Sequence, residues 1–503
     1  MHRDHTVQQV DELLTQSQAA FYQYKNCSIK QRAHFLRTIA QEIEALGDEL
    51  IQTAAEETHL SEQRLIAERR RTIFQLTSYA DAAERGDWLE ARIDTGNQLS
   101  SPPKPDLRKL LVPLGPVVVF GASNFPFAYS TAGGDTACAF AAGCPVIVKA
   151  HPAHVKTSTL VADVIYAAVK KCEMPTGIFA HIYGKEFAVG EYLVKHDVVK
   201  AVGFTGSYSG GRALFDLAAQ RKNPIPVFAE MGSVNPVFLL PNKVAEEKQW
   251  IAEQLTKSIT QDMGQFCTNP GLLVGINNED LEVCLQELVA GVAKIEAHQM
   301  LHEGIAKNFK ENRLKALGAD DVKLLYESKS GPDGAKITIA RVPAKSFLEN
   351  QQLHEEVFGP FTLAIICDNE EQLHQVAHAL EGQLTTTLMA SDKDLTEHVS
   401  LLNILREKCG RLILNGVPTG VEVALAMQHG GPFPSCTDSR FTAVGADGIK
   451  RFARPVSFQN WNNQYLPAEL KDENPLNIWR TVNNELTKEK IKNPTTVNNM
   501  RCH

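Results

Sequence analysis

Between Gly115 and Glu230, short runs rich in β-branched residues alternate with helical stretches. This alternation restricts the fold more than any other feature of the chain, because strand–helix–strand units build parallel sheets covered by helices on both faces. Ligands of such sheets bind at the carboxyl ends of the strands. We expect strands at 117–121, 145–149, 178–183, 199–204 and 226–230, and helices at 130–142, 155–171, 186–195 and 207–220.

A second α/β alternation follows in the later half of the chain. We expect its strands and helices at 235–240, 244–262, 272–276, 279–294, 362–367, 370–382, 385–390, 393–406 and 411–415. Residues 6–92 have the apolar spacing of helices, with Ser28 and Ser61 as N-caps. The sequence therefore predicts an α/β protein with two parallel-sheet domains of the Rossmann type.

Composition excludes several classes of protein. The 503 residues are 43% hydrophobic and carry a net charge of -8, so a basic face for nucleic acid is not expected. The longest apolar run, 110–122, is interrupted by two prolines and is too short to span a bilayer. The amino terminus lacks an apolar signal core, and the ten cysteines follow no CxxC pattern. These features predict free thiols and a cytoplasmic protein without a membrane or nucleic-acid partner.

Cys267 is the candidate nucleophile. It stands in a loop between Gly264 and Gly271, and Pro270 rules out an ordinary helix through it. A cysteine on such a loop becomes a nucleophile if its thiolate is stabilised and a base lies nearby. The alternative interpretation is a small buried core residue.

Polar residues at the ends of four expected strands are candidates for the same site. Asn124 is able to donate to an oxyanion, and Glu230 is able to act as a general base. Lys149 suits a ribose or phosphate, and the turn at Gly206 and Ser207 suits a pyrophosphate. Each has a plainer interpretation as a turn residue, a helix cap or a surface acid. The pair His151 and His154 has no third ligand nearby in sequence, so we expect no metal.

Each motif alone occurs in many protein families, but the order of the motifs along the chain is specific to one family. The series SNFP, VKA, FTGS, AEMG, GQFC, EEVFGP and ILNG, from Ala122 to Gly416, resembles the aldehyde dehydrogenase superfamily. The resemblance implies that Cys267 is the nucleophile, Glu230 the general base, and Asn124 the side chain of the oxyanion hole.

The same resemblance implies the cofactor contacts. Lys149 matches the contact to the adenosine ribose, Gly206 and Ser207 match the pyrophosphate turn, and Glu356 and Phe358 match the nicotinamide-ribose contacts.

The cofactor is expected to be NADP, with NAD also possible. Many NAD-using members carry a glutamate three residues after the lysine, and here that position is Pro152. Without that carboxylate a 2′-phosphate meets no repulsion, and Lys149, His151 or Lys185 is available to pair with it.

One subgroup of the superfamily has similar residues in five segments, 120–126, 132–136, 149–154, 429–434 and 437–441. That subgroup contains α-ketoglutaric semialdehyde (2,5-dioxovalerate) dehydrogenases and an NADP-dependent fatty aldehyde dehydrogenase. We expect oxidation of 2,5-dioxopentanoate to 2-oxoglutarate, with long-chain aldehydes as the alternative substrates. A nucleotide-binding protein without turnover is the alternative from another class. Phe125 and Phe433 would line the aldehyde tunnel, and Arg440 or Arg108 would hold the far end of the substrate, unless they are structural ion-pair partners.

The resemblance also implies a domain plan. We expect a dinucleotide-binding domain from 1–105 and 115–231, and a catalytic domain from 232–449. A small oligomerisation arm from 106–114 and 450–462 favours a homodimer or homotetramer. The polar segment 485–503 is expected to be a mobile tail.

Overall fold

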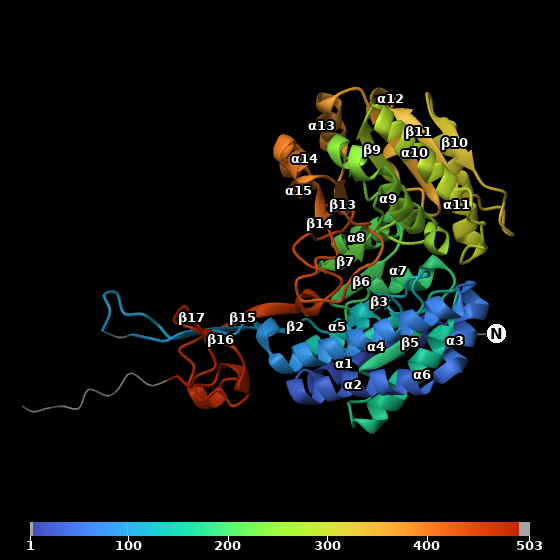
Figure 1. Cartoon of the computed structure of the whole chain (residues 1–503). Coiled ribbons are helices and arrows are strands. Elements are labelled where there is room, and N and C mark those ends of the chain that lie inside the picture. Colours follow the sequence, from blue (N-terminus) through green and yellow to red (C-terminus); the bar gives the residue numbers. More distant parts are fainter. Residues whose placement is uncertain (1–3, 98, 492–503) are drawn as a thin grey trace, which may run out of the picture.

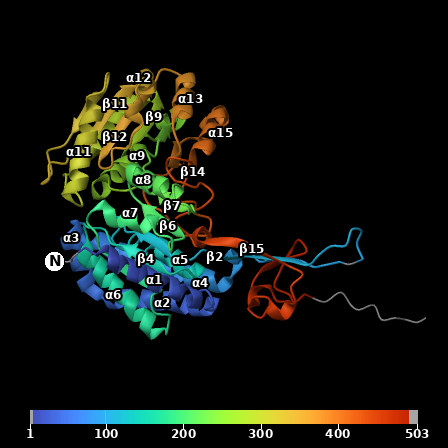
Figure 2. The same ribbon diagram turned by 180° about the vertical axis from the view of Figure 1, so that it is seen from behind.

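A computed structural model describes residues 4–97 and 99–491 of the chain. It has two α/β bodies, one above the other in Figure 1, and an arm of strands that projects from the lower body. Figure 2 shows the same arrangement from behind. Within the described ranges, no helix combines the length and the apolar character needed to cross a lipid bilayer.

The lower body is built on a parallel sheet with the strand order β5-β4-β3-β6-β7. Its apolar side chains alternate between the two faces, so that Val117 and Val119 join one apolar cluster while Val118 joins another. The strands are β3 (Val117–Phe120), β4 (Val146–Lys149), β5 (Phe179–Ile182), β6 (Ala201–Thr205) and β7 (Val227–Glu230). Each lies within the segment predicted from the sequence or within one residue of it.

Helices cover both faces of this sheet. One face packs against α2 (Ile29–Ala45), α4 (Glu62–Arg85), α5 (Gly134–Ala142) and α6 (Val155–Lys171), and α3 (Gly47–Thr58) lies beside α6. The other face packs against α1 (Val7–Tyr24), α7 (Phe187–Lys195) and α8 (Tyr208–Ala219). Ser28 and Ser61 cap α2 and α4 by accepting hydrogen bonds from backbone N–H groups, as predicted.

The upper body contains a seven-stranded sheet with the order β10-β11-β12-β9-β8-β13-β14, parallel except where β10 meets β11. Its strands are β8 (Val237–Leu239), β9 (Leu272–Ile276), β10 (Lys323–Glu327), β11 (Thr338–Pro343), β12 (Phe361–Cys367), β13 (Gln383–Met389) and β14 (Cys409–Leu414). Its helices are α9 (Pro241–Thr260), α10 (Glu279–Val292), α11 (Glu303–Leu317), α12 (Ala344–Glu349), α13 (Glu370–Ala379), α14 (Asp392–Glu397) and α15 (Val399–Lys408).

Two parts of the upper body differ from the sequence analysis. The segment between 295 and 361 received no predicted element, yet it forms α11, β10, β11 and α12. β10 is an edge strand in which only Leu324, Leu325 and Tyr326 are apolar, between two charged residues, so its strand signal is short. The helix predicted at 393–406 is two helices, because the backbone of His398 leaves the helical region at φ -111° and ψ 38°.

The arm is a separate five-stranded sheet with the order β15-β2-β1-β16-β17. In it β2 (Leu107–Pro113) pairs antiparallel with β15 (Ala453–Gln459), which joins the two segments predicted to form the arm. The remaining strands are β1 (Arg92–Asp94), β16 (Arg480–Val482) and β17 (Glu485–Thr487). Regular structure therefore extends into the segment predicted to be a mobile tail, whose residues 492–503 lie outside the described part.

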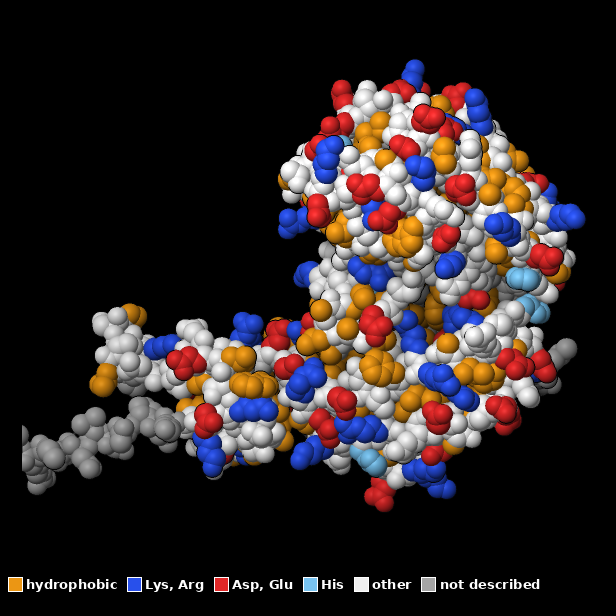
Figure 3. All heavy atoms as spheres, in the orientation of Figure 1, with side chains coloured by type: hydrophobic (Ala, Val, Ile, Leu, Met, Phe, Trp, Pro, Cys, Tyr) orange, Lys and Arg blue, Asp and Glu red, His pale blue; other side chains and the backbone are white. Residues whose placement is uncertain are grey.

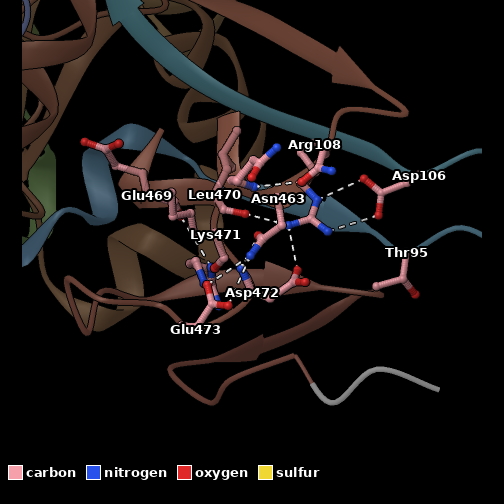
Figure 4. Close-up of polar contacts among 12 residues, drawn as sticks. Thr95, Asp106, Arg108, Asn463, Glu469, Leu470, Lys471, Asp472 and Glu473 are labelled. Atoms are coloured by element: carbon pink, nitrogen blue, oxygen red, sulfur yellow. Dashed lines mark hydrogen bonds and ion pairs between the residues drawn. The ribbon is translucent and has the colours of Figure 1, made fainter. Parts of the chain in front are cut away.

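Arg108 belongs to this arm and not to the substrate site (Figure 4). Its guanidinium forms ion pairs with Asp106 at 2.9 Å and Asp472 at 2.8 Å, and donates to the Leu470 carbonyl oxygen at 2.7 Å. Arg108 is therefore a structural ion-pair partner, the second of the two interpretations that its sequence context left open.

Candidate active site

The Cys267 loop lies against the end of β7. A buried Asn235 side chain holds the loop by donating hydrogen bonds to the carbonyl oxygens of Cys267, at 2.8 Å, and of Asn269, at 3.0 Å. Gly264 enters the loop with a φ of +60°, and a Cβ there would meet the Gly359 carbonyl oxygen at 2.6 Å. Only glycine fits this approach, which confirms the tight backbone turn predicted before the cysteine.

Three reactive groups converge at this point. His429 Nε2 is 3.1 Å from Glu230 Oε1 and 3.7 Å from Cys267 Sγ, and one atom from each of the three side chains falls within a 4.8 Å cluster. Glu230 and His429 are buried, whereas Cys267 is partly accessible. A nitrogen that faces both a thiol and a carboxylate is placed to accept a proton from the first and to be stabilised by the second.

Burial and charge shift the two acids in opposite directions. Burial, the charge of Glu230 and a hydrogen bond to Glu230 raise the pKa of the Cys267 thiol well above its ordinary value. Burial alone would raise the pKa of Glu230, but the charge of His429 and hydrogen bonds from His429 and Cys267 lower it below its ordinary value. The resting pair is therefore a thiol beside a carboxylate.

Asn124 reaches the same loop from the end of β3. Its side-chain amide donates to the Gln265 carbonyl oxygen at 3.1 Å, two residues before Cys267. The amide nitrogen therefore faces the nucleophile loop and keeps a second hydrogen for an oxygen bound there.

The strand ends of the lower sheet form a crevice next to this site. The side chain of Ser207 caps α8 by accepting from Gly210 N–H, and a Cβ at Gly206 would meet the Phe204 ring at 2.7 Å. The tight turn at Gly206 leads into a helix N-terminus, and a partly buried Lys149 lies at the end of β4, on the other side of β3. This arrangement fits a dinucleotide phosphate chain. Figure 3 shows a hollow between the two bodies on this face of the molecule.

A third histidine, His302, joins the pair His151 and His154 that follows β4. His151 lies 5.5 Å from His154 and 5.7 Å from His302 between ring centroids. Burial lowers the pKa of all three rings. Lys185 is exposed, and its backbone N–H donates to Asp4 at 3.1 Å.

Glu356 and Phe358 line a small pocket against the nucleophile loop, together with Phe266 and Asn269. Burial raises the pKa of the Glu356 carboxyl to about 8. A Cβ at Gly232 would meet Glu356 Oε2 at 2.7 Å, so this glycine leaves room for the acid. The contact of Glu356 and Phe358 with the nicotinamide end of a dinucleotide stays a prediction.

The family model described as "Aldehyde dehydrogenase family" matches residues 2–455, more than half of the chain.

The chain belongs to the aldehyde dehydrogenase family.

It is 46% identical over 466 residues to "Alpha-ketoglutaric semialdehyde dehydrogenase 2" of Azospirillum brasilense, covering 92% of this chain and 88% of that protein. It is 43% identical over 486 residues to "Alpha-ketoglutaric semialdehyde dehydrogenase" of Acinetobacter baylyi, covering 96% and 92%. Among solved structures, glyceraldehyde-3-phosphate dehydrogenase GapN from Methanocaldococcus jannaschii, complexed with NADP, matches with a TM-score of 0.76 at 19% identity. That match covers 91% of this chain and 95% of that one, and it supports the fold alone.

As an aldehyde dehydrogenase, the protein is an NAD(P)-dependent oxidoreductase that acts on small aldehydes and converts them to acids. The nine described cysteines are all free thiols, as expected.

The two predicted aromatic contacts of the substrate, Phe125 and Phe433, lie in different surroundings. The Phe125 ring packs against Tyr129 at 5.2 Å and Phe266 at 5.8 Å, beside the nucleophile loop. Phe433 is half exposed and packs against Tyr208 at the start of α8, on the cofactor side. Its role in the aldehyde tunnel stays a prediction.

Arg440 is poorly placed for the predicted role. Its side chain is 79% exposed and forms an ion pair with Asp438 at 2.5 Å. The prediction that it holds the far end of the substrate therefore lacks support from its position.

The sequence analysis gave no role to His429, Arg71 or Tyr129. His429 stands in a glycine- and proline-rich segment, and nothing local relates it to a cysteine 162 residues earlier. Arg71 lay in a basic run on a helix, which favours a solvated face.

Proposed function

We propose that this aldehyde dehydrogenase oxidises α-ketoglutaric semialdehyde (2,5-dioxopentanoate) to 2-oxoglutarate. The observation that carries the proposal is the 43–46% identity, over more than 90% of the chain, to two relatives that bear this activity in their names. Relatives at this level share most of the residues around a site, and the Cys267, Glu230 and Asn124 geometry is that of an acyl-transfer centre.

The first half of the reaction uses Cys267, His429 and Asn124. The thiol proton passes to His429 Nε2, 3.7 Å away, and the thiolate attacks the aldehyde carbon. Asn124 and the Cys267 backbone N–H stabilise the resulting oxyanion. Collapse of this adduct to a thioester requires a hydride acceptor, which a nicotinamide cofactor held by Lys149, Ser207 and Glu356 would supply.

The second half uses Glu230. Its lowered pKa keeps the carboxylate ionised at neutral pH, so that it is able to accept a proton. Glu230 therefore accepts a proton from the water that attacks the thioester, which releases the carboxylic acid product and the thiol.

The preferred cofactor in this proposal is NADP, with NAD also accepted. An exposed Pro152 takes the place of the acid that would repel a 2′-phosphate, and Lys149, His151 and His302 supply nearby donors. A phosphate dianion would favour the protonated form of these histidines, whose pKa values burial lowers. Asp4 opposes this preference, because its negative charge acts on Lys149.

Three kinetic measurements test the proposal. The ratio kcat/KM for 2,5-dioxopentanoate should exceed that for a long-chain aldehyde, and a clear advantage for the long-chain aldehyde would favour the alternative substrate. KM for NADP should be lower than KM for NAD, and the opposite order would defeat the cofactor preference. Cys267→Ser should abolish hydride transfer, and an unchanged rate would exclude Cys267 as the nucleophile.

The proposal includes a cytoplasmic homodimer or homotetramer assembled through the arm formed by β2 and β15. Exposed apolar side chains on and beside the arm sheet, among them Trp461, Trp479 and Leu486, suit such a contact. Sedimentation of the full chain and of a Leu486→Asp variant would test it, and a monomeric wild-type protein would contradict it.

A further inference from the structure

Two arginine side chains flank the catalytic site, and both are held by one loop, residues 417–421. Arg71 on α4 donates from Nη1 to the Val421 carbonyl oxygen at 2.7 Å and from Nη2 to the Tyr129 hydroxyl at 3.3 Å. Arg411 on β14 donates to two carbonyl oxygens of the same loop, at 2.9 Å and 2.6 Å. The loop thus brings guanidinium groups from the two bodies to the same place.

Neither positive charge is neutralised by protein. Among residues 4–97 and 99–491, neither Arg71 nor Arg411 forms an ion pair, and the Nε of each is buried without an acceptor. Arg64 lies two turns before Arg71 on α4. It differs from Arg71, because Glu68 at 2.8 Å and Asp262 at 3.1 Å neutralise its charge. A buried guanidinium without a counter-ion is costly, and an anion bound there would relieve that cost.

A short chain of contacts connects Arg71 to the nucleophile. The Tyr129 ring lies 5.8 Å from the Arg71 guanidinium carbon and 6.4 Å from the His429 ring. Tyr129 also packs on Phe125, next to the nucleophile loop. Only the Tyr129 ring therefore separates Arg71 from His429, whose Nε2 is 3.7 Å from Cys267 Sγ.

Both charges act on the catalytic sulfur. Burial and Glu230 raise the pKa of Cys267, and Arg71 is a charge that opposes them. Burial lowers the pKa of Arg411, and negative charge on Cys267 or Tyr129 opposes that effect. Arg411, like Arg71, is thus within electrostatic reach of the reaction centre.

We propose that Arg71 and Arg411 bind the carboxylate at the far end of the substrate and set the preference for anionic semialdehydes over neutral aldehydes. This inference rests on the proposed function and names the residues behind its substrate class. In a five-carbon semialdehyde the carboxylate lies about 5 Å from the aldehyde carbon, since four carbon–carbon bonds of about 1.5 Å separate them. Guanidinium groups bind a carboxylate by paired, charge-assisted hydrogen bonds.

The test compares Arg71→Met and Arg411→Met with the wild-type enzyme. The readout is the ratio of kcat/KM for 2,5-dioxopentanoate to kcat/KM for pentanal, a neutral aldehyde of the same length. We expect each variant to lower this ratio about 10- to 100-fold, mainly through KM for the anionic substrate. Arg70→Met on α4 and Arg406→Met on α15 remove exposed arginines and should leave the ratio at the wild-type value.

A binding measurement separates this inference from the proposed substrate. Glutarate, a five-carbon dicarboxylate, should inhibit pentanal oxidation by competition with the aldehyde, and both Met variants should weaken that inhibition. If the wild-type enzyme prefers pentanal, the proposed substrate fails, and glutarate still decides the role of the arginines. Unchanged ratios and unchanged glutarate inhibition in both variants would overturn the inference. Arg71→Lys and Arg411→Lys serve if a Met variant unfolds, and each should lose a smaller part of the ratio, because lysine keeps the charge without the paired geometry.

Discussion

Replacing Glu230 by Gln should change two steps of the reaction in opposite directions. The reactive atoms of Glu230, His429 and Cys267 all lie within 4.8 Å of one another. At this distance and an effective dielectric constant of about 20, two unit negative charges repel by about 3 kcal/mol. The Glu230 carboxylate therefore lowers the thiolate population of Cys267, in addition to the effect of burial.

Alkylation of Cys267 by iodoacetamide at pH 7 measures that population. We expect Glu230→Gln to be alkylated about tenfold faster or more, since 1.4 kcal/mol corresponds to a factor of ten. Steady-state turnover should nevertheless fall about 10²- to 10⁴-fold, because the general base for thioester hydrolysis is lost. A burst of reduced cofactor should remain, which shows that the loss lies after hydride transfer.

Glu356→Gln is the matched control. Burial raises the pKa of Glu356 to about 8, so at pH 7 most of its carboxyl groups are protonated and neutral. Its removal should therefore leave alkylation at pH 7 within about twofold of the wild-type rate. As the pH rises above 8, Glu356 ionises in the wild-type enzyme, and the variant should become the faster of the two. Alkylation of Glu230→Gln at the wild-type rate or slower would refute the electrostatic reasoning.

Four other predictions follow from the geometry. His429→Gln should lower kcat about 100-fold or more by removing the proton acceptor for Cys267. Because His429 lowers the pKa of Glu230, the acid limb of the pH–rate profile should also move to higher pH. An unmoved limb would contradict this. Asn124→Ala should lower kcat about 10²- to 10³-fold by removing an oxyanion donor, while iodoacetamide alkylation, which forms no oxyanion, serves as the control and stays near the wild-type rate. Pro152→Glu should raise KM for NADP relative to KM for NAD by about tenfold, because a carboxylate then faces the 2′-phosphate; an unchanged ratio of the two would count against the assigned ribose pocket. Zn²⁺ should inhibit the enzyme, because a thiolate, an imidazole and a carboxylate within 4.8 Å form a zinc-ligand set. A chelator should restore activity. Equal inhibition of the His429→Gln variant would place the zinc elsewhere.

Local patterns were sufficient for most of the fold. The strands of the lower sheet are runs of β-branched residues buried on both faces, so each has the same signature wherever it lies in the chain. The pattern fails where an element is not fully buried. β10 at the sheet edge and the arm strands β16 and β17 are short and mix polar with apolar residues, and their pairing supplies the order that their sequence does not signal.

The candidate site divides in the same way. Asn124, Lys149, Ser207 and Glu230 each follow a strand of the parallel sheet, and the carboxyl ends of such strands meet at one edge, so the sequence predicted their common location. His429 and Arg411 come from the chain after β13, and Arg71 comes from a helix near the amino terminus. Their sequence context is that of a loop, an edge strand and a basic helix face.

The sequence by itself determined the family, the parallel sheets and the order of the catalytic motifs, because these depend on residue periodicity and on short segments that carry their own signal. Tertiary structure alone decided that a histidine lies between the thiol and the acid, that Arg108 pairs with Asp472, and that Arg71 and Arg411 meet at one loop without an ion pair among the described residues. The physical reason is that proximity, burial and charge neutralisation are properties of side chains distant in sequence, and they arise only when the two bodies pack together.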